Sequence, residues 1–155
     1  MRNHELAKRE AAIRALIHDT GVATAGDLEL QSHWAKYLCV LVAGYTESAL
    51  HLLYASYVDK CTPVPVAKFA TQKIKELQNP RPNRFVEVAR AFKEDWGAKL
   101  EEFIALDGRH EAINAIMTAR HLIAHGKSSD ISVHRVSEYF DKSVKVAEFI
   151  ESQLS

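Results

Sequence analysis

One stretch of the sequence constrains the fold more than any other: residues 37–58, YLCVLVAGYTESALHLLYASYV, carry a single charge, Glu47. A helix of this length and apolarity is long enough to span a bilayer. Glu47 lies at its middle, however, and an acidic side chain at the centre of a membrane costs about 3 kcal/mol. The stretch is therefore expected to be the central helix of a soluble bundle, buried on most of its sides.

The length and composition of the chain favour a single globular domain over residues 1–155. The chain has 155 residues, 47% of them hydrophobic and 26% charged, and its 20 Lys plus Arg balance 20 Asp plus Glu. A disordered chain combines low hydrophobicity with high net charge, and a protein that coats nucleic acid over a long surface is markedly basic. Both classes are excluded, while a local nucleic-acid site remains open.

The two cysteines indicate the redox setting. Cys39 and Cys61 lie at or near the ends of the same expected helix, so they are about 33 Å apart at 1.5 Å per residue. That separation exceeds the reach of a disulfide, which favours a reducing, cytoplasmic setting. The first ten residues are charged and contain no apolar segment, so no secretory signal peptide is expected.

The apolar periodicity is helical along almost the whole chain, and no alternating strand pattern is present. Glycine- and proline-rich breaks divide this pattern into separate helices. The predicted helices span residues 3–18, 27–60, 65–77, 84–105, 109–125 and 132–152. The expected fold is an all-α bundle. The same spacing predicts a core position for five aromatic residues: Trp34, Tyr37, Phe85, Phe92 and Trp96.

The residues that could carry chemistry are concentrated in the helix expected over residues 109–125. Ile113, Ile116 and Met117 define a buried stripe, and Arg120 falls on that same stripe. A guanidinium keeps its proton, so a buried one needs an anionic partner or must open onto a cleft. His125 lies at the helix C-terminus, which favours a charged imidazolium, and histidine exchanges protons near neutral pH.

Glu47 is a second charged residue in an unexpected place, because it is a carboxylate in the middle of the most apolar helix. Buried charges are normally paired, so Glu47 and Arg120 are expected to approach each other across the bundle. Each residue at this site also has a simpler interpretation. His125 could be a surface residue that complements the helix dipole, and Arg120 could extend its head group into solvent.

A metal site is a further alternative for the same helix. His121 and His125 are four residues apart, which places both imidazoles on one face where they could bind a metal ion. The sequence lacks the glutamate that stands beside the first histidine of a zincin. Both cysteines are also distant along the chain, and no metal or other cofactor is expected.

The segment Arg120-His121-Leu122-Ile123-Ala124-His125-Gly126 resembles the Arg-polar-x(3–5)-His motif of the HEPN superfamily. Its surroundings are similar to the RiboL-PSP-HEPN branch: a long helix with a central glutamate, an Asn-Pro loop (Asn79-Pro80), a helix containing Trp96, the motif, a short loop and a final helix. The resemblance covers about residues 30–152. It implies a HEPN-like four-helix up-and-down bundle over residues 27–152, with short connecting helices and an additional N-terminal helix over residues 1–20.

The resemblance implies an activity as well. HEPN domains commonly form homodimers, and many are metal-independent endoribonucleases in which the motifs of two subunits share one cleft. By this resemblance the RNA 2′-hydroxyl attacks its own phosphate, with His125 as general base or acid and Arg120 stabilising the phosphorane. Glu47 would orient Arg120, and His121, in the polar position of the motif, would bind the phosphate. The biological setting would be a toxin–antitoxin pair, RNA restriction or antiviral defence.

The partners follow from the same resemblance: RNA, a second copy of the chain, and an antitoxin or sensor protein. Arg81, Arg84 and Lys127 are candidates for contacts with the RNA backbone, and a solvated basic surface is the simpler alternative. DNA lacks the nucleophile and is not expected to be cut. No membrane partner is expected. The alternative function is a non-catalytic HEPN dimer that binds RNA, nucleotide or protein, but the presence of both Arg120 and His125 favours the enzyme.

Overall fold

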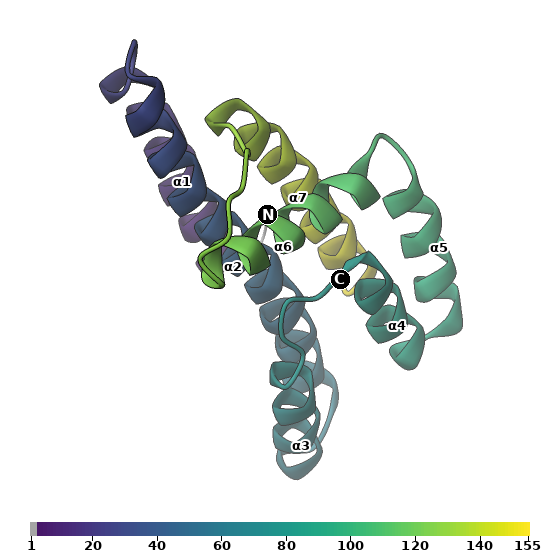
Figure 1. The fold of residues 1–155 in the computed structure, drawn as a ribbon. Helices are drawn as coiled ribbons and strands as arrows, with labels where there is room; N and C mark the ends of the chain where they lie inside the picture. The colour runs from purple at the N-terminus through teal and green to yellow at the C-terminus, as the bar shows by residue number, and fades with distance from the viewer. Residues whose placement is uncertain (1–2) are drawn as a thin grey trace.

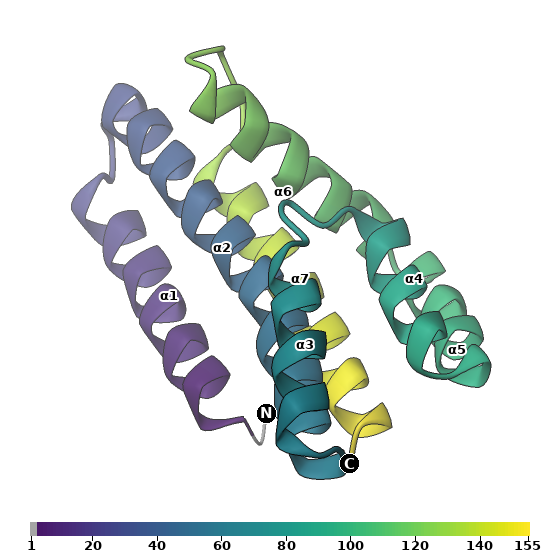
Figure 2. The ribbon, with the colours of Figure 1, turned by 90° about the horizontal axis from the view of Figure 1, so that it is seen from below.

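The computed structural model describes residues 3–155, which form seven α-helices and, within that range, no strand. The expected all-α fold is confirmed. In Figure 2, α1 lies along one side of α2, and α6 lies along the other side. The helices are α1 (His4–Ala23), α2 (Leu28–Cys61), α3 (Val64–Lys75), α4 (Pro82–Phe92), α5 (Glu94–Ala105), α6 (Arg109–Ala124) and α7 (Val133–Gln153).

Helix α2 is the central element of the bundle, as its apolar sequence predicts. It begins at the N-cap Asp27, whose carboxylate accepts a hydrogen bond from the N–H of Leu30 at 2.9 Å. In the described residues it is the one helix long and apolar enough to cross a membrane, and 56% of its most apolar window is buried in the protein. Helices α1, α3, α6 and α7 all pack on it. Its apolar surface therefore forms the core of the bundle.

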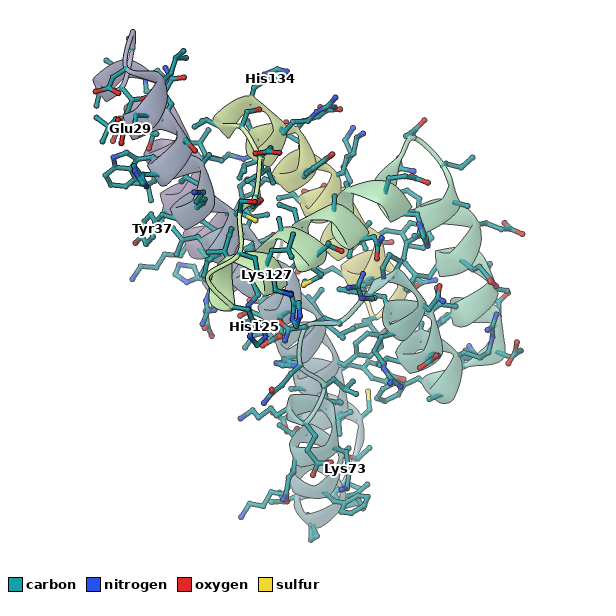
Figure 3. The ribbon with its side chains drawn as sticks, in the orientation of Figure 1. Glu29, Tyr37, Lys73, His125, Lys127 and His134 are labelled. Atoms are coloured by element: carbon teal, nitrogen blue, oxygen red, sulfur yellow. The ribbon has the colours of Figure 1, made fainter. Side chains whose placement is uncertain are left out.

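The core lies where α2, α6 and α7 meet. Tyr45 of α2 packs edge-on against Phe140 of α7, with ring centroids 5.1 Å apart. The aromatic predictions are confirmed for Phe85 but wrong for Tyr37 and Phe92, which are 51% and 37% exposed. Tyr37 points away from the bundle (Figure 3), and its ring makes an edge contact with Trp34 of the same helix. Phe92 lies at the end of α4, where it stacks on Tyr54 and meets Tyr57 edge-on but stays partly open to solvent.

The single helix predicted over residues 84–105 is wrong, because the chain folds back on itself there to form α4 and α5. Lys93 between them has extended backbone angles, φ −158° and ψ 127°. Gly97 lets the two helices approach closely: a Cβ at this position would lie 2.5 Å from the Cβ of Arg90. Helical periodicity continues through the turn, so the sequence pattern alone does not reveal the break. The resulting hairpin lies at one edge of the molecule (Figure 1).

Helix α1 is longer than predicted, because it continues through Thr20 and Gly21 to Ala23. A glycine inside a helix costs only about 1 kcal/mol relative to alanine, and the chain turns instead at Gly26, where φ is +84°. Helix α1 is packed against α2 and α7. Arg14 forms an ion pair of 2.7 Å with Asp141, which joins α1 to α7.

Candidate active site

The Arg120–His125 segment forms the last turn of α6 and the cap that follows it. Ile113, Ile116 and Met117 are buried as predicted, and they hold one face of α6 against the core. Arg120 continues this stripe and is half-buried, so its guanidinium lies at the edge of the core rather than inside it. The charged head group of Arg120 is therefore placed near the surface at the C-terminal end of α6.

The cap fixes the position of His125. His125 is the C-cap residue of α6, and Gly126 after it adopts the left-handed conformation, with φ +67°. The N–H of Lys127 then bonds back to the carbonyl of Leu122 at 2.9 Å, which completes a Schellman cap. Figure 3 shows His125 and Lys127 close together at this end of α6. The predicted glycine stop is confirmed, and it holds an imidazole at the surface.

His121 and His125 form a pair of exposed imidazoles. Their ring centroids are 4.4 Å apart and their planes are tilted by 60°. Among the described residues neither ring is hydrogen-bonded to another group, so both are open to a ligand. Residues 3–155 contain no group of three or more His, Cys, Asp or Glu that could hold a metal ion. The two histidines alone would supply a metal with two ligands.

The predicted direct pairing of Glu47 with Arg120 is wrong. Arg120 donates through Nη1 to the amide oxygen of Asn79, and the described residues contain no ion pair between Arg120 and Glu47. Glu47 instead accepts a hydrogen bond from the backbone N–H of Asn79, at 2.5 Å. The carboxylate thus acts on the arginine through a third residue, which belongs to a loop 32 positions along the chain from Glu47.

The α3–α4 loop, residues 76–81, is what brings these groups together. Asn79 adopts a positive φ of 49°, a conformation that asparagine tolerates better than most residues. On the α2 side, Glu47 binds the N–H of Asn79, and His51 Nε2 is 2.7 Å from the carbonyl oxygen of Leu77. On the α6 side, Arg120 binds the Asn79 side chain. The loop therefore bridges the two helices that carry the candidate residues.

Arg81 from the same loop is also bound to α6. Its Nη1 donates to Asn114 Oδ1 at 2.5 Å and to Thr118 Oγ1 at 3.2 Å. Asn114, Thr118, His121 and His125 follow one another at spacings of four, three and four residues, which places them in one row along α6. The structure therefore brings Arg81 to the same helix face as the two imidazoles.

Arg84 and Lys127 are less closely tied to this row. Arg84 forms an exposed ion pair of 2.6 Å with Glu87 of its own helix, and such surface pairs contribute little to stability. Lys127 follows the cap of α6 and is exposed. A surface cavity of about 520 Å³ lies against the α3–α4 loop and the first turns of α4, and Asn79, Arg81 and Arg84 are among its lining residues. This cavity adjoins the Arg120 contact through Asn79.

An all-α bundle with an Arg-x4-His segment at the exposed end of a core helix is the arrangement that the resemblance to HEPN domains leads us to expect. The chain matches the family model of RiboL-PSP-HEPN over residues 4–155, and it belongs to that family. Membership indicates a nuclease or another RNA-related module. A search of curated proteins and a search of solved structures gave no match. The family match includes α1, which the resemblance seen in the sequence left outside.

Sequence reasoning missed the role of Asn79 and of the polar row that begins at Asn114. The Asn79-Pro80 loop is visible in the sequence, but no local pattern shows that its amide contacts a helix 41 residues away. The row on α6 had a usable signal, because polar residues recur from Asn114 onward with helical spacing.

Proposed function

We propose that the chain is a metal-independent endoribonuclease of HEPN type. The supporting observation is the end of α6, where Arg120, held by the neutral amide of Asn79, and two exposed imidazoles lie within six consecutive residues. Phosphodiester cleavage by the RNA itself needs these two kinds of group: a proton-transfer group and a donor for the phosphorane oxygens.

The proposed reaction is an internal transesterification. The ribose 2′-oxygen bonds to the adjacent phosphorus and loses its proton to a base, and the bond to the 5′-oxygen of the next nucleotide breaks. The products are a 2′,3′-cyclic phosphate and a 5′-hydroxyl, so no water or cofactor enters this step. His125 transfers a proton, Arg120 binds the oxygens that gain negative charge, and His121 hydrogen-bonds the phosphate. Arg81, Arg84 and Lys127 bind the flanking backbone.

We further propose that the active form is a homodimer. The base that takes the 2′-proton and the acid that protonates the leaving 5′-oxygen act on opposite sides of the phosphorus. His121 and His125 are neighbours on one helix face, with ring centroids 4.4 Å apart, which favours contact with one side. A second copy with its α6 end facing the first would supply the other group and close the cleft.

The proposed setting is the cytoplasm, in a toxin–antitoxin pair, RNA restriction or antiviral defence. An antitoxin or sensor protein would then control the exposed end of α6. These proposals rest on the family to which the chain belongs and on the exposure of both imidazoles.

The test is cleavage of mixed single-stranded and structured RNA in EDTA by the parent, by His125→Ala and by His134→Ala. His134 is the matched control, an exposed histidine at the start of α7 that is well separated from His125 in Figure 3. We expect the parent and His134→Ala to cut RNA and leave cyclic phosphate ends, His125→Ala to be inactive, and DNA to stay intact. A folded parent that binds RNA without cutting it would refute the enzyme and favour the non-catalytic module.

A further inference from the structure

The partner of Arg120 has an unexpected chemical character. A half-buried guanidinium normally meets a carboxylate, yet here it meets the side-chain amide of Asn79. Glu47 is close enough to bind the backbone N–H of Asn79, but it forms no ion pair with Arg120 among the described residues. Glu47 therefore contacts the loop at the backbone of Asn79, whereas Arg120 contacts the Asn79 side chain.

The identity of the contacting atom follows from hydrogen-bond chemistry. A guanidinium has five N–H donors and no acceptor, so the atom of Asn79 that faces it must be Oδ1. That oxygen takes one donor, Nη1, and the guanidinium makes no other hydrogen bond within residues 3–155. The remaining donors are therefore available to a phosphate.

An amide and a carboxylate differ here in one respect. Both accept a hydrogen bond and so both fix the direction of the guanidinium, but only the carboxylate cancels its charge. Neutralisation would weaken the attraction between Arg120 and an RNA phosphate, because charge-assisted hydrogen bonds are the stronger ones. Orientation without neutralisation is what a phosphate-binding arginine requires.

We propose that Asn79 is the positioning residue of Arg120, and that its neutral amide aims the guanidinium at an RNA phosphate while leaving the positive charge intact. Glu47 contributes by fixing the backbone of Asn79. The proposal rests on the ribonuclease function proposed above, and it adds how Arg120 keeps its affinity for phosphate.

The backbone conformation of Asn79 narrows the substitutions that can test this role. Its φ of +49° is accessible to asparagine, aspartate and glycine, whereas other side chains are strained there. Asn79→Asp keeps the acceptor and adds a charge, and Asn79→Gly removes the acceptor without straining the backbone. Asn3→Asp is the matched control, because Asn3 is also half-buried and also accepts a hydrogen bond through its amide oxygen, as the N-cap of α1.

The experiment combines three measurements on the full chain: unfolding temperature, NMR of the arginine side-chain nitrogens, and binding of a 2′-O-methyl RNA oligonucleotide that cannot be cut. Cleavage of the unmodified RNA then gives kcat and KM. For Asn79→Asp we expect a slowly rotating Arg120 guanidinium as in the parent, with RNA binding weakened at least tenfold. For Asn79→Gly we expect the NMR signal of slow rotation to be lost and kcat to fall at least tenfold. Asn3→Asp should match the parent.

Two results would overturn the role of Asn79. One is parent-like RNA affinity in a folded Asn79→Asp, and the other is a slowly rotating Arg120 with parent-like kcat in Asn79→Gly. A parent that binds the methylated RNA but cuts no RNA refutes the proposed enzyme alone, since the NMR and binding measurements do not require cleavage.

Discussion

Replacing Gly97 by alanine tests the close contact that turns one expected helix into the α4–α5 hairpin. The new Cβ would lie 2.5 Å from the Cβ and 2.9 Å from the Cα of Arg90. Carbon atoms in contact are about 3.5–4.0 Å apart, so the two helices must separate by about 1 Å. Such overpacking costs about 1–3 kcal/mol, while alanine gains about 1 kcal/mol over glycine inside a helix.

The net effect of Gly97→Ala is therefore a loss of up to about 2 kcal/mol of unfolding free energy, since the clash involves backbone and cannot relax by a side-chain rotation. For a chain of this size that lowers Tm by up to about 8 °C. Gly21→Ala in α1 is the matched control, because a Cβ added there would meet no atom within 4 Å outside the adjoining backbone of its own helix. There we expect a gain of about 0.5–1 kcal/mol.

The assay is thermal and urea unfolding of the parent and both variants, followed by circular dichroism of the helices. If Gly97→Ala proves as stable as Gly21→Ala, the approach of α4 to α5 is not set by the missing side chain. The explanation given for the break in the predicted helix would then be wrong.

Three further outcomes can be checked with single variants. Glu47→Gln replaces a charged acceptor for the N–H of Asn79 by a neutral one, so we expect a loss of about 1 kcal/mol in urea unfolding and reduced RNA cleavage; parent-like values would show that the carboxylate does not fix the loop. Gly126→Ala forces a side chain into φ +67°, which should cost about 1–2 kcal/mol and displace His125, and an unchanged Tm would contradict this. Burial raises the pKa of the Cys39 thiol to about 12, whereas Cys61 is exposed. A thiol reagent at pH 8 should therefore modify one cysteine in the native protein and both after denaturation, and Cys61→Ser should leave none reactive in the native state.

The sequence predicts most of the fold because helix periodicity is a local property. The apolar stretch around Glu47 predicts the central helix, and the buried stripe predicted for α6 is confirmed at Ile113, Ile116 and Met117. The break at Lys93 could not be predicted in this way, since it depends on how closely α4 and α5 pack at Gly97. The periodicity of the two helices runs on across the turn.

In the candidate site, too, local features were predictable and contacts between distant residues were not. The motif from Arg120 to His125 and its glycine cap can be recognised from consecutive residues, and the structure places them at the end of α6 and in the cap that follows. The partner of Arg120 could not be predicted from the sequence. The rule that buried charges are paired points to a carboxylate, whereas the protein uses the side-chain amide of a residue from a separate loop. Glu47 contacts the same loop residue as Arg120, but the direct contact predicted between the two was wrong.

The way in which the α3–α4 loop is attached to the bundle predicts which part of the molecule opens first on heating. Its apolar contribution is limited to Leu77 and Pro80, and its other attachments are polar contacts with residues such as Glu47, His51 and Arg120, whereas the helices are held by a continuous apolar core. Segments with few buried apolar contacts open at a lower free energy than the whole structure. Mild warming would thus open the loop and release Arg120 from Asn79 while the helices stay folded. The stability of the loop would then limit how long the site stays assembled, and the core would limit how long the fold persists.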